Sequence, residues 1–135
     1  MIEHYTKRRV LYAETDKMGY LYYGHYASFY ETGRAEFIRN YGITYRAMEE
    51  ELGIMMPVAF LECRYKLPAK YDELLTIKTY MKEIPRRLFQ VEHDILNEKG
   101  QIINQGIIKL FFVDMKTNKN VSCPEYVKKA FEAYF

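Results

Sequence analysis

Several features that define common classes of protein are missing from this sequence. It has only two cysteines, Cys63 and Cys123, which lie far apart and belong to no CxxC pair. This spacing argues against a disulfide framework and against a zinc site, and free thiols fit a reducing cytoplasm. No apolar run approaches the roughly 20 residues of a membrane-spanning helix, and the basic N-terminus leads into no apolar signal segment. We therefore expect a cytoplasmic protein with no membrane partner.

The sequence also lacks a large excess of positive over negative charge. The 20 basic and 18 acidic residues leave a formal net charge of only +2, and the basic residues are spread along the chain. A nucleic-acid partner is therefore not expected. The chain has no tryptophan, but it contains 14 tyrosines and 8 phenylalanines. Because tyrosine combines a flat apolar ring with a polar tip, this composition suits subunit interfaces and ligand clefts as well as a core.

The first half of the chain is predicted to hold one strand and two helices. Alternation predicts a strand over 8–14, and apolar residues at helical spacing predict a long amphipathic helix over 23–41. Gly33 lies within the apolar stripe of that helix, where it costs helix propensity. Its presence indicates a close crossing of the helix over a sheet. Thr44 is expected to cap a shorter helix that Gly53 ends.

The second half is predicted to be mostly sheet. Strand patterns recur over 54–66, 74–84, 88–97 and 101–114, and a short helix is expected over 124–134. Short links between consecutive strands, among them a hairpin turn at 97–100, favour an antiparallel meander. The sum is an α+β protein with one domain over 1–135, in which about five antiparallel strands wrap around the long helix.

The segment before the long helix is the best candidate for chemistry. Asp16 comes where the first strand pattern has ended, Gly19 permits a tight or left-handed turn, and a helix begins a few residues later. A helix start presents unpaired backbone N–H groups and the positive end of the helix dipole. The loop would therefore place a carboxylate beside groups that polarise an electrophile. The alternative is that Asp16 only caps the helix or closes an Asx-turn, as most loop aspartates do.

This segment also resembles a known family. The motif consists of Thr15, Asp16, Gly19, the run Tyr22 to Tyr26, Glu31 and Arg34. Together with the order of elements along almost the whole chain, it resembles the hotdog-fold acyl-CoA thioesterases, in particular the 4-hydroxybenzoyl-CoA thioesterase branch. The stretch Tyr71 to Leu74 resembles a second, less specific motif of that family.

The resemblance implies a fold, an assembly and two site residues. The fold would be a hotdog fold, a five-stranded antiparallel sheet wrapped around a long central helix. Members form homodimers, often paired into homotetramers, with active sites at the interface between subunits. Asp16 would be the catalytic carboxylate, and the backbone N–H of Tyr23 would polarise the thioester carbonyl. This sequence departs from the family at three positions: Tyr23 stands where many members carry His, His25 where Asn is common, and Glu14 where Asp is common.

A single carboxylate is enough for this chemistry. The leaving thiol has a pKa of about 8.5, so it departs as a thiolate with little acid assistance. Asp16 would act either as a general base on water or as a nucleophile that forms a mixed anhydride, and the sequence leaves both roles open. Backbone N–H groups at the helix start would stabilise the oxyanion. No metal or redox cofactor is expected.

The remaining candidates are expected to contact substrate: Gly19, Tyr22, His25, Tyr26, Glu31, Arg86 and Arg87. Arg86 and Arg87, with Arg64 and Lys66, are candidates for holding the phosphates of coenzyme A, although such residues are more often plain surface charges. Glu31 is the reserve catalytic carboxylate, the alternative being an ordinary helix ion pair with Arg34. His93 alternates with apolar residues and is expected to be a sheet residue with a hydrogen-bonded ring.

The function expected from these features is hydrolysis of acyl-CoA to a free carboxylic acid and coenzyme A. Two alternatives stay open. One is a thioesterase that acts on acyl groups carried by acyl carrier protein, which would need a basic docking patch. The other is a hotdog module that binds acyl-CoA without turnover, although such a module would not need Asp16.

Overall fold

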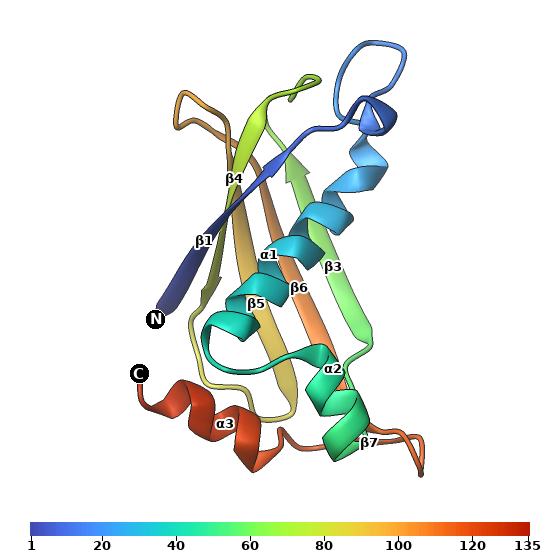
Figure 1. The fold of residues 1–135 in the computed structure, drawn as a ribbon, viewed down its shortest axis with the longest axis vertical. Helices are drawn as coiled ribbons and strands as arrows, with labels where there is room; N and C mark the ends of the chain where they lie inside the picture. The colour runs from blue at the N-terminus through green and yellow to red at the C-terminus, as the bar shows by residue number, and fades with distance from the viewer.

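The computed structural model describes residues 1–135. Its helices and strands follow one another in this order (Figure 1): β1 (Ile2–Arg9), α1 (Tyr26–Asn40), α2 (Tyr45–Ala47), β2 (Ile54–Met55), β3 (Val58–Tyr65), β4 (Leu74–Met81), β5 (Leu88–Leu96), β6 (Ile102–Asp114), β7 (Lys119–Val121) and α3 (Glu125–Glu132). Short helical turns of other types occur at Tyr12–Glu14 and Tyr23–His25, and a π-helical turn, Met48–Leu52, continues α2.

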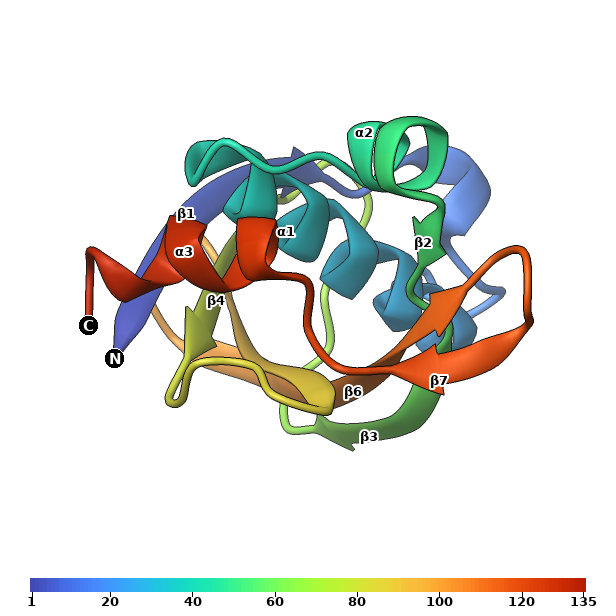
Figure 2. The same cartoon turned by 90° about the horizontal axis from the view of Figure 1, so that it is seen from below.

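One antiparallel sheet wraps around α1. Its long strands lie in the order β1, β4, β5, β6, β3, and the short strands β2 and β7 pair with the end of β6. Seen from below, the sheet curves around α1 (Figure 2), and α2 and α3 lie near the lower end of the sheet in Figure 1. The predicted antiparallel sheet around a long helix is therefore confirmed. The predicted count of five strands is wrong, because the structure has seven.

Two of the predicted strand boundaries are wrong. The strand expected over 54–66 is divided into β2 and β3, because Pro57 between them has no N–H to donate to a ladder. The strand expected over 8–14 lies instead at Ile2–Arg9, where it pairs with β4 along its whole length. Its side chains are mostly polar, so apolar alternation does not mark it. The residues that follow it turn, because the Glu14 carboxylate accepts the backbone N–H of Leu11 at 2.9 Å.

The helix α1 approaches the sheet closely at two glycines. A Cβ atom at Gly33 would lie 2.6 Å from both Ile77 Cγ2 and Thr79 Oγ1, which confirms the predicted close crossing. A Cβ atom at Gly106 of β6 would overlap the ring of Tyr30. Because both positions lack a side chain, the helix backbone reaches the sheet and the Tyr30 ring fills the space over β6.

A buried histidine lies under the helix. His93 is fully buried, its ring stacks on that of Tyr30 with centroids 4.8 Å apart, and Nδ1 lies 2.9 Å from Thr79 Oγ1. The predicted hydrogen-bonded sheet histidine is thus confirmed at Nδ1, whereas Nε2 has no partner. Burial, and to a smaller extent the charge of Arg34, lowers the pKa of His93 to about 3. The ring is therefore neutral in the folded protein near pH 7.

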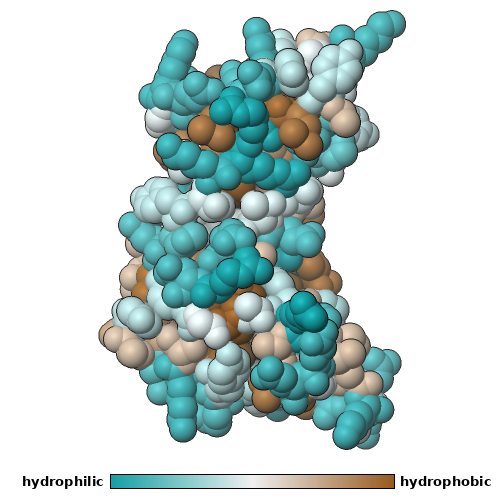
Figure 3. Space-filling model, in the orientation of Figure 1, coloured by the Kyte–Doolittle hydropathy of each residue, from teal (hydrophilic) through white to brown (hydrophobic).

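The core is one cluster of 24 buried residues between α1, the inner face of the sheet and α3. On the face of the molecule seen in Figure 1, apolar side chains reach the surface in separate patches among polar ones (Figure 3). None of the helices combines the length and the apolar character that crossing a membrane requires.

Substitution of Gly33 by Ala should destabilise the protein. The added methyl group would meet Ile77 and Thr79 at 2.6 Å, and overpacking of this kind costs about 1–3 kcal/mol. Ala27→Gly on the exposed side of the same helix is the matched control, and it should lose about 1 kcal/mol through helix propensity alone. Urea unfolding of both variants checks this. A Gly33→Ala variant more stable than wild type would contradict the close crossing.

The stability of the protein should fall as the pH is lowered from about 6.5 toward about 3. The folded pKa of His93 lies below its unfolded value of 6.5, so in this window the unfolded chain binds a proton that the folded chain does not. Each pH unit should cost up to about 1.4 kcal/mol. Unfolding free energies at about pH 7, 6 and 5 should therefore fall less in His93→Gln than in wild type. Equal pH dependence of the two proteins would be the contrary result.

Candidate active site

Asp16 is held in a tight loop between β1 and α1. Its backbone N–H donates to the carbonyl of Tyr20 at 2.8 Å, and the N–H of Gly19 donates to the Asp16 carbonyl at 2.9 Å. Oδ1 accepts the backbone N–H groups of Met18 at 2.9 Å and Tyr20 at 3.2 Å. Gly19 has a φ of +81°, as the sequence predicted for a left-handed turn. The Asx-turn is therefore present, and it fixes the carboxylate while Oδ2 stays without a partner in the chain.

An ion pair ties the start of this loop to the helix. Glu14 is buried, and its Oε2 accepts from Arg8 Nη2 at 2.6 Å. The other terminal nitrogen of Arg8 donates to Ser28 Oγ at 3.0 Å and Thr32 Oγ1 at 3.1 Å, both on α1. The guanidinium also lies 4.0 Å from the centre of the Phe29 ring. One arginine therefore joins β1, the loop and the helix.

The helix start offers free donors next to this loop. The turn Tyr23–His25 leads directly into α1, and the backbone N–H groups of Tyr23 and Gly24 make no hydrogen bond within the chain. The carbonyl of Tyr23 accepts a hydrogen bond from the Tyr65 hydroxyl at 3.1 Å. The helix dipole adds positive potential at this end. An anionic or polarised oxygen would therefore be stabilised here.

Asp16 and Tyr23 line the same open cavity of about 320 Å³. Most of its lining is apolar or aromatic, and Tyr26 and Tyr65 form one wall with ring centroids 5.2 Å apart. Burial raises the pKa of Tyr26 to about 12, with smaller contributions from Cys63 and Glu73, so its hydroxyl is uncharged at neutral pH. The cavity therefore joins one carboxylate, free backbone donors and apolar walls.

The structure brings together only part of the predicted site. Asp16, Tyr23 and Tyr26 line one cavity, and Gly19 forms the turn beside it. The ring of Tyr22 lies 4.5 Å from that of Tyr23 and 5.7 Å from that of His25, measured between centroids. Tyr22 is exposed and His25 is half-buried, so both belong to the rim of the site.

Glu31 is separate from this cavity. It is exposed and lines another depression, formed by α1 and Arg8. The ordinary ion pair between Glu31 and Arg34 is also absent, so that interpretation is wrong: Arg34 Nε donates instead to the Tyr45 hydroxyl at 2.6 Å.

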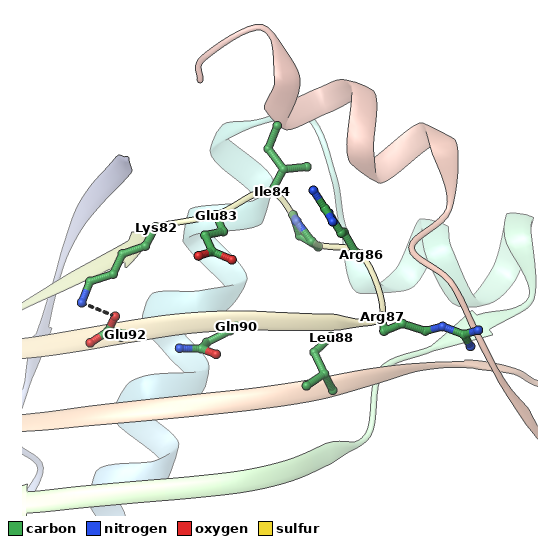
Figure 4. Close-up of a pocket in the computed structure, with 9 residues that line it drawn as sticks. Lys82, Glu83, Ile84, Arg86, Arg87, Leu88, Gln90 and Glu92 are labelled. Carbon is green, nitrogen blue, oxygen red and sulfur yellow. Dashed lines mark ion pairs between the residues drawn. The ribbon is translucent and has the colours of Figure 1, made fainter.

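Arg86 and Arg87 lie at the β4–β5 turn, at the end of the sheet away from the Asp16 loop (Figure 1). They line a cavity of about 340 Å³ together with Glu83, Gln90 and the ion pair between Lys82 and Glu92, whose charged atoms are 2.8 Å apart. Figure 4 shows that the two arginine side chains point in different directions. Within one chain, these arginines therefore do not face Asp16. Lys66, in contrast, lines the Asp16 cavity.

The sequence analysis missed the contribution of β3 to the site. Tyr65 lines the cavity and bonds to Tyr23. The sequence offered one indication: Tyr65 lies at the end of the strand predicted over 54–66, shortly before Pro68, and strand ends can line a site. No group of three or more His, Cys, Asp or Glu side chains is arranged to hold a metal ion.

An antiparallel sheet around one long helix, with a carboxylate loop at the helix start, defines the class of hotdog-type thioesterase folds. The chain belongs to the thioesterase-like superfamily, whose sequence profile matches residues 10–131.

Individual relatives agree with this assignment. The chain is 30% identical over 123 residues to "Acyl-CoA thioesterase YbgC" of Haemophilus influenzae, covering 91% of this chain and 90% of that protein. It is 35% identical to a DHNA-CoA thioesterase from Staphylococcus aureus, with a TM-score of 0.90 over 99% of this chain and 89% of the other. A 4-hydroxybenzoyl-CoA thioesterase is only 19% identical, with a TM-score of 0.86 over 95% of this chain and 97% of the other, which shows the fold alone. The particular branch expected from the sequence is thus a distant structural neighbour.

Proposed function

We propose that this protein is an acyl-CoA thioesterase that uses Asp16 as its catalytic carboxylate. The observation that carries the proposal is the cavity that Asp16 shares with the helix start at Tyr23. The names of the thioesterase relatives support the substrate class. The reaction is hydrolysis of the thioester, which yields a carboxylic acid and coenzyme A. The cytoplasmic location remains a prediction.

The helix start stabilises the charge that develops on the carbonyl oxygen. The N–H groups of Tyr23 and Gly24 are free, and each donor to an oxyanion is typically worth about 3–4 kcal/mol of barrier. Because the donors are backbone groups, the histidine that many family members carry at position 23 is not required for this role. Tyr22, Tyr26 and His25 surround the acyl group or the pantetheine arm as it enters.

Asp16 acts on the opposite side of the same carbonyl. Its Oδ1 is held by two backbone N–H groups, and Oδ2 is free to accept a proton from water or to attack the carbonyl carbon. In the first case the proton moves to Oδ2 as the hydroxide adds. In the second, an anhydride forms and the thiolate leaves before water regenerates the carboxylate. Both routes use the same geometry.

The protein is proposed to work as a homodimer or a pair of dimers. The edge strand β3 pairs only with β6, and exposed apolar side chains lie along it at Val58, Phe60, Leu61 and Tyr65. An unpaired edge of this kind is a template for a second chain. The cavity at Asp16 reaches β3 through Tyr65, so a second subunit on this edge would close it.

Replacement of Asp16 by Asn should abolish hydrolysis and leave the fold intact, because Asn retains an Oδ1 that accepts the two loop bonds. Free thiol release from short, long and aromatic acyl-CoAs should fall by about 100-fold or more. Asp114→Asn is the matched control, since Asp114 Oδ1 accepts two similar backbone bonds, from Lys116 and Thr117, in another turn. This variant should keep wild-type turnover.

Three outcomes would count against the assignment. Near-wild-type turnover by Asp16→Asn would remove the mechanism. A loss in Glu31→Gln as complete as in Asp16→Asn would put Glu31 first. Tight binding without release by the wild type would favour the non-catalytic module or a carrier-protein substrate.

We further propose that Arg86 and Arg87 of a second subunit hold the phosphates of the coenzyme A bound at Asp16. Reversing both charges to Glu should raise the KM for acyl-CoA by about tenfold or more while kcat stays near wild type, because the phosphates lie far from the reacting carbonyl. Lys116→Glu with Lys119→Glu changes the net charge equally at exposed positions and should leave KM unchanged. An unchanged KM in the arginine variant would remove this assignment.

A further inference from the structure

Arg34 is a buried cation without an anion. Only 6% of its surface is exposed, yet no carboxylate lies within ion-pair distance. Its one hydrogen bond runs from Nε to the Tyr45 hydroxyl at 2.6 Å, and the two terminal nitrogens have no partner in the chain. Burying a guanidinium without a counter-charge costs several kcal/mol. No ion pair within the chain offsets this cost, so an anion from outside the chain would stabilise the guanidinium.

The terminal nitrogens of Arg34 are not enclosed and reach the molecular surface. The enclosed side-chain nitrogen and oxygen atoms without a partner belong to His4, Glu73 and His93, and none belongs to Arg34. Contacts along the helix show how the height of Arg34 compares with β3. The ring of Tyr26 contacts that of Tyr65 with centroids 5.2 Å apart, and the Tyr30 hydroxyl lies 3.2 Å from Cys63 Sγ.

Moving four residues along α1, from Tyr26 to Tyr30, therefore corresponds to moving two residues back along β3, from Tyr65 to Cys63. The two distances agree, since four helical residues rise about 6 Å and two strand residues about 6.6 Å. The next step places Arg34 level with Leu61 of β3. Leu61 is 47% exposed, so the edge strand is uncovered at the height of the unpaired guanidinium.

This height is also the middle of the edge. The strand β3 has eight residues, Val58–Tyr65, with its midpoint between Leu61 and Glu62. If two copies of β3 paired antiparallel and were matched end to end, their two-fold axis would pass through that midpoint, which by the same matching is level with Gly33, between Glu31 and Arg34. Around a two-fold axis, residue i of one copy faces residue j of the other, and j faces i. A side chain of α1 that lies close to the height of this axis and reaches the β3 edge then faces the α1 helix of the second copy.

Glu31 is the acidic residue near this height that has no partner, since Glu36 pairs with Arg39 and Glu62 with Arg64. It stands three positions before Arg34, about 4.5 Å along the helix axis, and its exposed carboxylate makes no hydrogen bond or ion pair in the chain. We infer that Arg34 pairs with Glu31 of the partner subunit, and that the two-fold axis of the dimer makes this pair twice. The inference rests on the proposed dimer and names the residues that hold it together.

The pair explains why these residues do not bind each other within one helix. Arg34 is buried and its Nε donates to the Tyr45 hydroxyl at the start of α2, while Glu31 stays exposed. The second copy then supplies the anion at the surface to which the Nη groups point. A surface ion pair adds little, but a pair enclosed between two subunits is costly to break.

Charge exchange tests the pair. Glu31→Arg and Arg34→Glu each place like charges opposite one another at two positions of the dimer, and each should raise the dimer dissociation constant by about 100-fold or more in sedimentation equilibrium. The double variant, Glu31→Arg with Arg34→Glu, restores opposite charges and should return the constant to within about tenfold of wild type. Circular dichroism shows whether each variant is folded.

Glu36 and Arg39 provide a matched control on the same helix. They form an ion pair with the same spacing, and both side chains are exposed. Reversing the charge of either residue should leave the dissociation constant unchanged, because this pair faces solvent.

Three results would overturn the inference. They are a wild-type protein that is monomeric at micromolar concentration, a Glu31→Arg variant that dimerises like wild type, and a folded double variant that stays dissociated. Glu31→Arg keeps the test decisive even if Arg34→Glu does not fold, because Glu31 is exposed and makes no hydrogen bond or ion pair within the chain. Thiol release measured on the same samples separates the two proposals: a stable wild-type dimer without hydrolysis contradicts the thioesterase and not the pair.

Discussion

The close contact of α1 with the sheet is the constraint on which the rest of the structure depends. Gly33 lets the helix backbone reach Ile77 and Thr79, and Gly106 leaves room for the ring of Tyr30. A bulkier residue at either glycine would lift the helix, and with it the turn at Tyr23. The position of the backbone donors at the helix start is therefore set by packing in the middle of the core, remote from the cavity.

The other half of the site is fixed separately. The Asp16 loop is attached through Glu14 and Arg8 to the outer side of α1, so the sheet holds the helix and the helix holds the loop. The hydrogen bonds to Oδ1 then set the carboxylate relative to its own loop. Because each attachment uses different residues, the carboxylate and the helix start are positioned by separate sets of contacts to α1.

Local patterns predicted the parts of the fold that local physics determines. The helix α1, the strands β4, β5 and β6 and the capping side chain of Thr44, which accepts the N–H of Ala47, agree with the sequence prediction. The strand β1 was misplaced because its pairing depends on backbone bonds to β4 rather than on apolar alternation. Asp16 and Tyr23 were predicted together because one short motif, which resembles that of the thioesterase family, contains both. Tyr65 was missed because it is 42 residues from Tyr23, and the sequence pattern does not show which strand end meets the helix start.

The bond from Tyr65 to the carbonyl of Tyr23 also acts on the electronic state of the site. That carbonyl belongs to the same peptide unit as the N–H of Gly24, one of the two free donors. A hydrogen bond accepted by a peptide oxygen shifts electron density away from the nitrogen, and such cooperative polarisation strengthens the next bond by about 10–30%. The edge strand therefore contributes a phenol that makes a backbone amide more acidic without touching the ligand that the amide would bind.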